Sequence, residues 1–134
     1  MEQDKPVILL ADDEPLVRNF VRFALTKHGY HVLAASDGVE ALQISRGYDG
    51  PIDLLLSDVK MPRMTGPQLA EVMKRERPDT RVLLISGHSS GSIPDYLRAE
   101  LLRKPFLARV LIKRIEQALQ SGPSDEPHVT GPES

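Results

Sequence analysis

The chain has 134 residues, the length of a single domain, and its 40% hydrophobic and 27% charged residues are ordinary for a folded protein. It contains no cysteine, which excludes disulfides and thiol chemistry. The formal net charge of −2 gives no electrostatic reason to expect broad nucleic-acid binding. No apolar run reaches the roughly 20 residues of a membrane span, and the N-terminus lacks the order of a signal peptide. These features predict a cytoplasmic domain.

The first two segments of the chain differ in their hydrophobic pattern. Residues 7–11 form an unbroken apolar run, which is typical of a strand covered on both faces of a parallel sheet. Residues 15–28 predict a helix that Gly29 ends. The apolar side chains of this helix form a stripe with two neighbours beside it: Leu16, Phe20 and Ala24, with Val17 and Val21.

The middle of the chain continues the alternation of strand and helix. Three further apolar runs predict strands, of which the first is the weakest: residues 31–35, 52–57 and 82–86. Two segments resemble capping boxes, in which side chains bind backbone amides at the start of a helix: Asp37–Glu40 and Thr65–Gln68. The first helix should run to about Ser45, and the second should stop before Pro78.

The last part of the chain predicts a short helix at residues 94–99, a brief fifth strand at 100–103 and a final helix at 107–119. One face of the final helix is apolar, with Leu107, Leu111, Ile115 and Ala118. Residues 121–134 are rich in proline and glycine and predict a flexible tail or linker after a domain of residues 1–120. Five successive strand-then-helix units predict a doubly wound α/β fold.

Chemically active side chains stand where the predicted strands end. The first strand is followed by Asp12 and Asp13, and the third by Asp58. The fourth ends in Ser86, and Lys104 follows the fifth. Because ligands of an open parallel sheet bind outside the carboxyl ends of its strands, we expect these groups to converge on one edge.

The residue types at this edge suit phosphoryl transfer. Three neighbouring carboxylates repel one another, and a divalent cation relieves the repulsion. An oxygen-rich site with room for water suits Mg²⁺. A lysine ammonium neutralises a carboxylate or a phosphate as a point charge, and a hydroxyl donates to a phosphoryl oxygen. A carboxylate nucleophile, a metal and an ammonium together make a site that acts by positioning and electrostatics.

In this arrangement the chain resembles the response-regulator receiver family of two-component systems, which includes the chemotaxis response regulator. The resemblance covers residues 6–120. The matching pieces occur in order: Asp12-Asp13, Leu54–Asp58 with Met61-Pro62 and Gly66, Ser86 after an apolar strand, and Lys104-Pro105-Phe106. The resemblance implies a flavodoxin-like (βα)5 fold with a five-stranded parallel sheet in the order 2-1-3-4-5.

The resemblance also implies a role for each matching residue. Asp58 would be the phosphoacceptor. Four groups would bind Mg²⁺: the carboxylates of Asp12, Asp13 and Asp58 and the backbone carbonyl of Lys60. Ser86 would be the switch hydroxyl, and Lys104 would contact the phosphate. The chain departs from the family at Leu101, where an aromatic switch residue is common.

The same resemblance predicts the partners. A sensor histidine kinase or a phosphotransfer protein would donate the phosphoryl group. A downstream protein would bind the face built from the 94–99 helix, the 100–103 strand and the 107–119 helix. The protein would then be a signalling phosphoacceptor that catalyses only its own phosphorylation and dephosphorylation, without direct contact to nucleic acid or membrane.

Two other functions are open from the residues. A receiver-like module could bind partners without taking phosphate, although such modules usually lose an acid or the lysine, and all are present here. An aspartyl-nucleophile phosphatase of the haloacid dehalogenase type also uses a carboxylate, Mg²⁺ and a lysine. That class carries its nucleophile on the first strand as Asp-x-Asp, whereas the first strand here leads into Asp12-Asp13-Glu14-Pro15.

Overall fold

The computed structural model describes residues 5–86, 101–103 and 106–120. The strands are β1 (Val7–Ala11), β2 (His31–Ala35), β3 (Leu54–Asp58), β4 (Arg81–Ser86) and β5 (Leu101–Arg103). The helices are α1 (Pro15–Lys27), α2 (Gly38–Gly47), α3 (Gly66–Glu76) and α4 (Ala108–Gln120). The strands form one parallel sheet in the order β2-β1-β3-β4-β5, which confirms the predicted topology. The predicted helix at 94–99 and tail at 121–134 lie outside the described residues.

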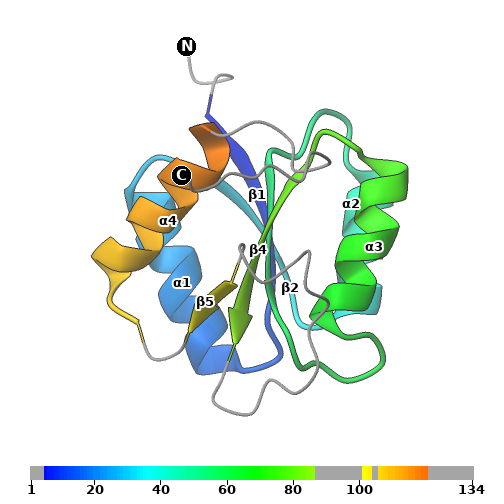
Figure 1. Cartoon of the computed structure of the whole chain (residues 1–134), viewed down its shortest axis with the longest axis horizontal. Helices are drawn as coiled ribbons and strands as arrows, with labels where there is room; N and C mark the ends of the chain where they lie inside the picture. Colours follow the sequence, from blue (N-terminus) through cyan, green and yellow to red (C-terminus); the bar gives the residue numbers. More distant parts are fainter. Residues whose placement is uncertain (1–4, 87–100, 104–105, 121–134) are drawn as a thin grey trace, which may run out of the picture.

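The sheet lies between two helical layers. Helices α1 and α4 cover one face, and α2 and α3 cover the other (Figure 1). Strand β1 is buried along its whole length, and its side chains alternate between the two layers. Ile8 and Leu10 belong to the core under α1 and α4, whereas Leu9 belongs to the core under α2 and α3. This two-sided burial explains why β1 is apolar without interruption. None of the helices in the described part of the chain has the length and apolarity of a membrane span.

The buried side of α1 differs from the predicted stripe. Leu16 is 85% exposed and Phe20 is 47% exposed, so neither belongs to the core. The side chains that face the sheet are Val21 and Leu25, which are fully buried, and Val17, which packs beside them. Apolar residues occur on both sides of α1, so helical periodicity alone does not identify the buried side.

The structure also corrects the predicted boundaries of elements, among them β3, α2 and α4. Asp58 is the last residue of β3 and pairs with Ile85, because the Val59 amide extends the ladder to the Ile85 carbonyl. Helix α2 continues to Gly47, beyond the predicted end. Leu107 precedes α4 and is 59% exposed, while Leu111 and Ile115 of the predicted apolar face are fully buried.

The two predicted capping motifs form differently. At α3 the Thr65 hydroxyl accepts from the Gln68 amide, and the Gln68 side chain accepts from the Thr65 amide, which confirms the capping box. At α2 Asp37 accepts from the Glu40 amide as predicted. The Glu40 carboxylate, however, binds the amide and hydroxyl of Ser36, one residue before the cap.

Arg77, directly after α3, ties the end of α2 and the loop before β3 to α3. Its guanidinium donates to the hydroxyl and carbonyl oxygens of Ser45, at 2.9 and 2.8 Å, and to the carbonyls of Tyr48 and Gly50, at 2.9 and 2.7 Å. The planar fork of an arginine is suited to so many acceptors at once. Arg77 therefore binds carbonyl groups at the end of α2 and in the loop beyond it, and it shares the Ser45 carbonyl with the Tyr48 amide, at 3.3 Å.

We expect Arg77→Lys to destabilise the fold, because an ammonium cannot reach all of these acceptors. The free energy of unfolding should fall by about 2 kcal/mol, as for lost hydrogen bonds of a charged donor. Urea unfolding followed by circular dichroism measures this change. Arg75→Lys, at an exposed position of α3, is the matched control and should leave the midpoint unchanged. Equal midpoints for the two variants would contradict the role assigned to Arg77.

Candidate functional site

The register of the sheet brings two of the predicted site residues together. Ala11 of β1 pairs with Ser57 of β3 in parallel. The residue that follows each of them in the chain is an aspartate, so Asp12 and Asp58 lie side by side at the carboxyl edge. On the other side of β3, Asp58 pairs with Ile85 of β4.

Asp12, Asp13 and Asp58 form one cluster of carboxylates. One oxygen of each lies within 4.8 Å of the others. Asp12 is fully buried and Asp58 is 6% exposed, whereas Asp13 is exposed to solvent. The cluster therefore has two donors inside the protein and one at the surface, which leaves access for water. Three hard oxygen donors around one point fit a hard divalent cation, so these residues could hold a metal ion.

The backbone around Asp12 is fixed by hydrogen bonds to neighbouring elements. Its amide donates to the Ala35 carbonyl of β2, at 3.2 Å. The Arg18 guanidinium of α1 donates to the Asp12 carbonyl, at 2.8 Å. The Glu14 amide donates to one Asp12 carboxylate oxygen, at 2.9 Å. These bonds hold the first acidic residue against both β2 and the start of α1.

The structure describes the other predicted site residues only in part. Ser86 ends β4, is fully buried and pairs in register with Arg103 of β5. Lys60 is exposed in the loop after β3. Lys104 lies outside the described residues, although it follows Arg103 directly in the chain. The cluster thus has Asp12 on one side of Asp58 and the end of β4 on the other.

Gly66 packs directly against the backbone of Asp58. A Cβ atom at Gly66 would overlap the Asp58 carbonyl oxygen and come within 3.1 Å of the Val59 Cα. The Gly66 amide also donates to the Val59 carbonyl, at 2.8 Å. A side chain at this position would therefore push the start of α3 away from the end of β3.

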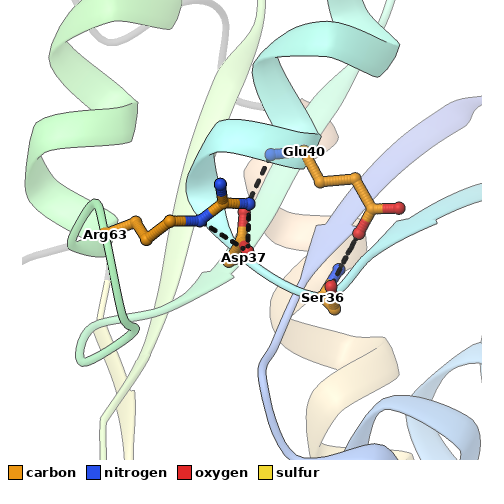
Figure 2. Close-up of polar contacts among 4 residues, drawn as sticks. All are labelled: Ser36, Asp37, Glu40 and Arg63. Carbon is orange, nitrogen blue, oxygen red and sulfur yellow. Dashed lines mark hydrogen bonds and ion pairs between the residues drawn. The ribbon is translucent and has the colours of Figure 1, made fainter.

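Two residues of the site region were missed by sequence reasoning. The Ser57 hydroxyl is buried and donates to the Asp58 carbonyl, at 2.8 Å. Arg63, in the loop after β3, forms an ion pair with Asp37, at 2.7 Å (Figure 2). The Ser57 bond is local and could have been considered from its place in the strand. The Arg63 pair joins residues 26 apart, and nothing in the sequence indicates it.

The chain is similar to proteins of one family. A family model described as the response regulator receiver domain matches residues 8–116. The response regulator receiver protein CpdR of Brucella abortus (strain 2308) is 38% identical over 116 residues, covering 84% of this chain and 95% of CpdR. The sensor kinase CckA of the same organism is 35% identical over 117 residues, covering 84% of this chain. This chain spans 12% of the length of CckA.

Solved structures give the same result for the fold. The crystal structure of a response regulator receiver domain protein from Clostridium thermocellum superposes with a TM-score of 0.75 and 32% sequence identity. The match covers 85% of this chain and 94% of that one. The similarity therefore extends over nearly the whole of a solved receiver domain.

We expect Gly66→Ala to destabilise the protein by about 2 kcal/mol, because the added methyl group would overlap backbone atoms of Asp58 and Val59. Chemical denaturation measures the loss. Gly47→Ala is the matched control, since a Cβ there meets nothing within 4 Å and alanine is the better helix former. A Gly66→Ala variant as stable as the control would contradict the close contact.

We also expect Asp13→Asn to change the response to divalent cations. Without metal, removing one of three clustered charges should raise the melting temperature by about 2 °C. Millimolar Mg²⁺ should raise the melting temperature of Asp13→Asn by less than that of the wild type, because one oxygen donor has lost its charge. Thermal unfolding in chelator and in MgCl₂ measures both effects. Asp79→Asn changes an exposed residue distant from the cluster and should behave as the wild type. An unaltered Mg²⁺ response in Asp13→Asn would contradict a metal site that includes Asp13.

Proposed function

Because this chain belongs to the response-regulator receiver family, we propose that Asp58 accepts a phosphoryl group from a phosphohistidine in a Mg²⁺-dependent reaction. Receiver domains are signalling domains of two-component systems and not enzymes in the ordinary sense. The observation that carries the proposal is the cluster in which oxygens of Asp12, Asp13 and Asp58 lie within 4.8 Å of one another. The donor would be a sensor histidine kinase or a phosphotransfer protein.

The position of Asp58 supports its choice as the nucleophile. It ends the central strand, between β1 with Asp12 and β4 with Ser86. A carboxylate oxygen of Asp58 would attack the phosphorus atom, and the bond from phosphorus to the imidazole nitrogen of the donor would break. The ring nitrogen that does not bear phosphorus would carry a proton, so that the histidine leaves as neutral imidazole with the electron pair of the broken bond. An in-line transfer of this kind depends on positioning and charge neutralisation.

The donor set fits a magnesium ion, for which three carboxylates and one backbone carbonyl are suitable ligands. Asp12, Asp13 and Asp58 would hold it together with the carbonyl of Lys60. When bound, Mg²⁺ would neutralise charge on the phosphoryl oxygens during transfer. Asp13 is exposed, which leaves space for water and for the incoming phosphoryl group.

Two further groups would act on the phosphoryl product. The Ser86 hydroxyl would donate a hydrogen bond to a phosphoryl oxygen, since Ser86 ends the strand next to β3. Lys104 would supply an ammonium for the same group, as the family pattern implies. Neither Ser86 nor Lys104 would form a covalent bond in these roles. Each would only have to lie beside the phosphoryl dianion on Asp58.

The phosphorylated form would be read by another protein. The charge placed on Asp58 would bias an equilibrium between two conformations of the face that contains residues 94–99, β5 and α4. Exposed apolar side chains near the start of α4 support docking there, since Leu107 is 59% exposed and Val110 is 40% exposed. Such exposed apolar groups are common at protein interaction sites.

We expect wild-type protein incubated with acetyl phosphate and Mg²⁺ to gain one phosphoryl group, and Asp58→Asn to gain none. An amide lacks the charged oxygen that attacks phosphorus. Intact-protein mass spectrometry measures the adduct, with a chelator-treated sample as the metal-free control. Asp49→Asn changes an exposed loop acid and should label as the wild type does.

Other results would favour the other functions. A wild-type chain that neither forms the adduct nor binds beryllofluoride would favour a receiver-like module that acts without phosphate. Turnover of an external phosphate ester far beyond one equivalent would favour an aspartyl-nucleophile phosphatase. An adduct that persists in Asp58→Asn would place the phosphoacceptor at another residue.

A further inference from the structure

The loop between β3 and α3 contains a strained turn. Arg63 has a φ of 71°, which is uncommon for a residue with a side chain. The Met64 amide donates to the Pro62 carbonyl, at 2.7 Å, so the three residues form a γ-turn centred on Arg63. A γ-turn with positive φ is rare and strained, and it persists only where surrounding contacts hold it.

The contact that holds this turn is an ion pair with the start of α2. The Nε and Nη2 atoms of Arg63 lie 3.2 and 2.7 Å from the Oδ2 atom of Asp37. The other oxygen of Asp37, Oδ1, accepts from the Glu40 amide at 2.8 Å (Figure 2). Asp37 therefore uses one oxygen for the helix and the other for the loop. The Asp37 side chain is 13% exposed and that of Arg63 is 61% exposed.

Close packing supports the same contact. A Cβ atom at Gly38 would come within 2.8 Å of the Met64 Cβ and 3.0 Å of the Met64 carbonyl oxygen. The residue after Asp37 and the residue after Arg63 thus lie in direct contact. The hydrogen bond from the Glu40 amide and the bond from Arg63 both lower the pKa of Asp37, so its carboxylate stays charged at neutral pH.

We propose that the Asp37–Arg63 ion pair positions the loop that carries the Lys60 carbonyl, and so sets the affinity of the acidic cluster for Mg²⁺. The inference rests on the proposed function, in which that carbonyl is a metal ligand. Lys60 stands between Asp58, which β3 fixes, and Arg63, which the ion pair fixes. The loop is therefore held at both ends. Neither Asp37 nor Arg63 belongs to the acidic cluster, so both are positioning residues.

Asp37→Asn separates this role from helix capping. Asparagine is as good an N-cap as aspartate, so the bond to the Glu40 amide is retained. The amide has no charge, so the ion pair with Arg63 is lost. We expect Mg²⁺ to bind roughly tenfold more weakly, the low end of the range for groups that orient a metal ligand. Isothermal titration with MgCl₂ measures the affinity, and urea unfolding should give a nearly unchanged midpoint.

Two more variants test the pair itself. Arg63→Gln removes the other charge and should weaken Mg²⁺ binding by a similar factor. The double variant Asp37→Asn/Arg63→Gln should be no weaker than either single variant, because both substitutions break one interaction. Glu40→Gln is the matched control: it changes the neighbouring contact with Ser36 and should leave the Mg²⁺ affinity unchanged.

The outcomes distinguish this inference from the proposed function. A tenfold weaker affinity in both single variants, without further loss in the double variant, supports the positioning role even where acetyl phosphate labels no residue. The absence of labelling by acetyl phosphate would contradict only the proposed phosphorylation of Asp58. Wild-type affinity in Asp37→Asn and Arg63→Gln overturns the positioning role while labelling of Asp58 still stands. Additive losses in the double variant, or a wild-type chain that binds no Mg²⁺, also overturn it.

Discussion

The parallel pairing of β1 with β3 sets the positions of the two buried acidic groups in the site. Ala11 lies opposite Ser57, so the next residues, Asp12 and Asp58, meet at the edge of the sheet. A shift of one residue would turn the side chains of β1 to the wrong face. Because Leu9 and Leu10 are each fully buried, on opposite faces, the cores on both sides of the sheet oppose such a shift.

The same packing provides the free energy that keeps like charges together. Two unit charges at about 4.8 Å repel by roughly 3 kcal/mol when the effective dielectric constant is about 20. One buried leucine or isoleucine contributes roughly 1.5–3 kcal/mol. Among the described residues, most of the leucine and isoleucine side chains that are less than 2% exposed lie on β1, β3 and β4. The central strands can therefore hold three carboxylates in a cluster that a cation would relieve.

Much of the fold and of the acidic cluster could be predicted from the sequence, because both depend on local patterns. Unbroken apolar runs mark the central strands, and Asp12, Asp13 and Asp58 follow from where those runs end. The buried side of α1 could not be predicted, since Leu16 and Val17 are equally apolar and only docking on the sheet distinguishes them. The bond between Arg63 and Asp37 depends on a three-dimensional approach that leaves no periodic signal.

The two loop arginines serve opposite ends of the same sheet. Arg77 binds carbonyl oxygens near the amino end of β3, among them those of Tyr48 and Gly50. Arg63 binds the carboxylate of Asp37 at the end where Asp58 lies. Backbone carbonyl groups are uncharged and do not titrate, so the contact of Arg77 with them is structural. The second contact is an ion pair beside a strained turn, and such a turn persists only where surrounding contacts fix it. Under the proposed positioning role, Arg77 would contribute stability near one end of β3, and Arg63 would set Mg²⁺ affinity near the other.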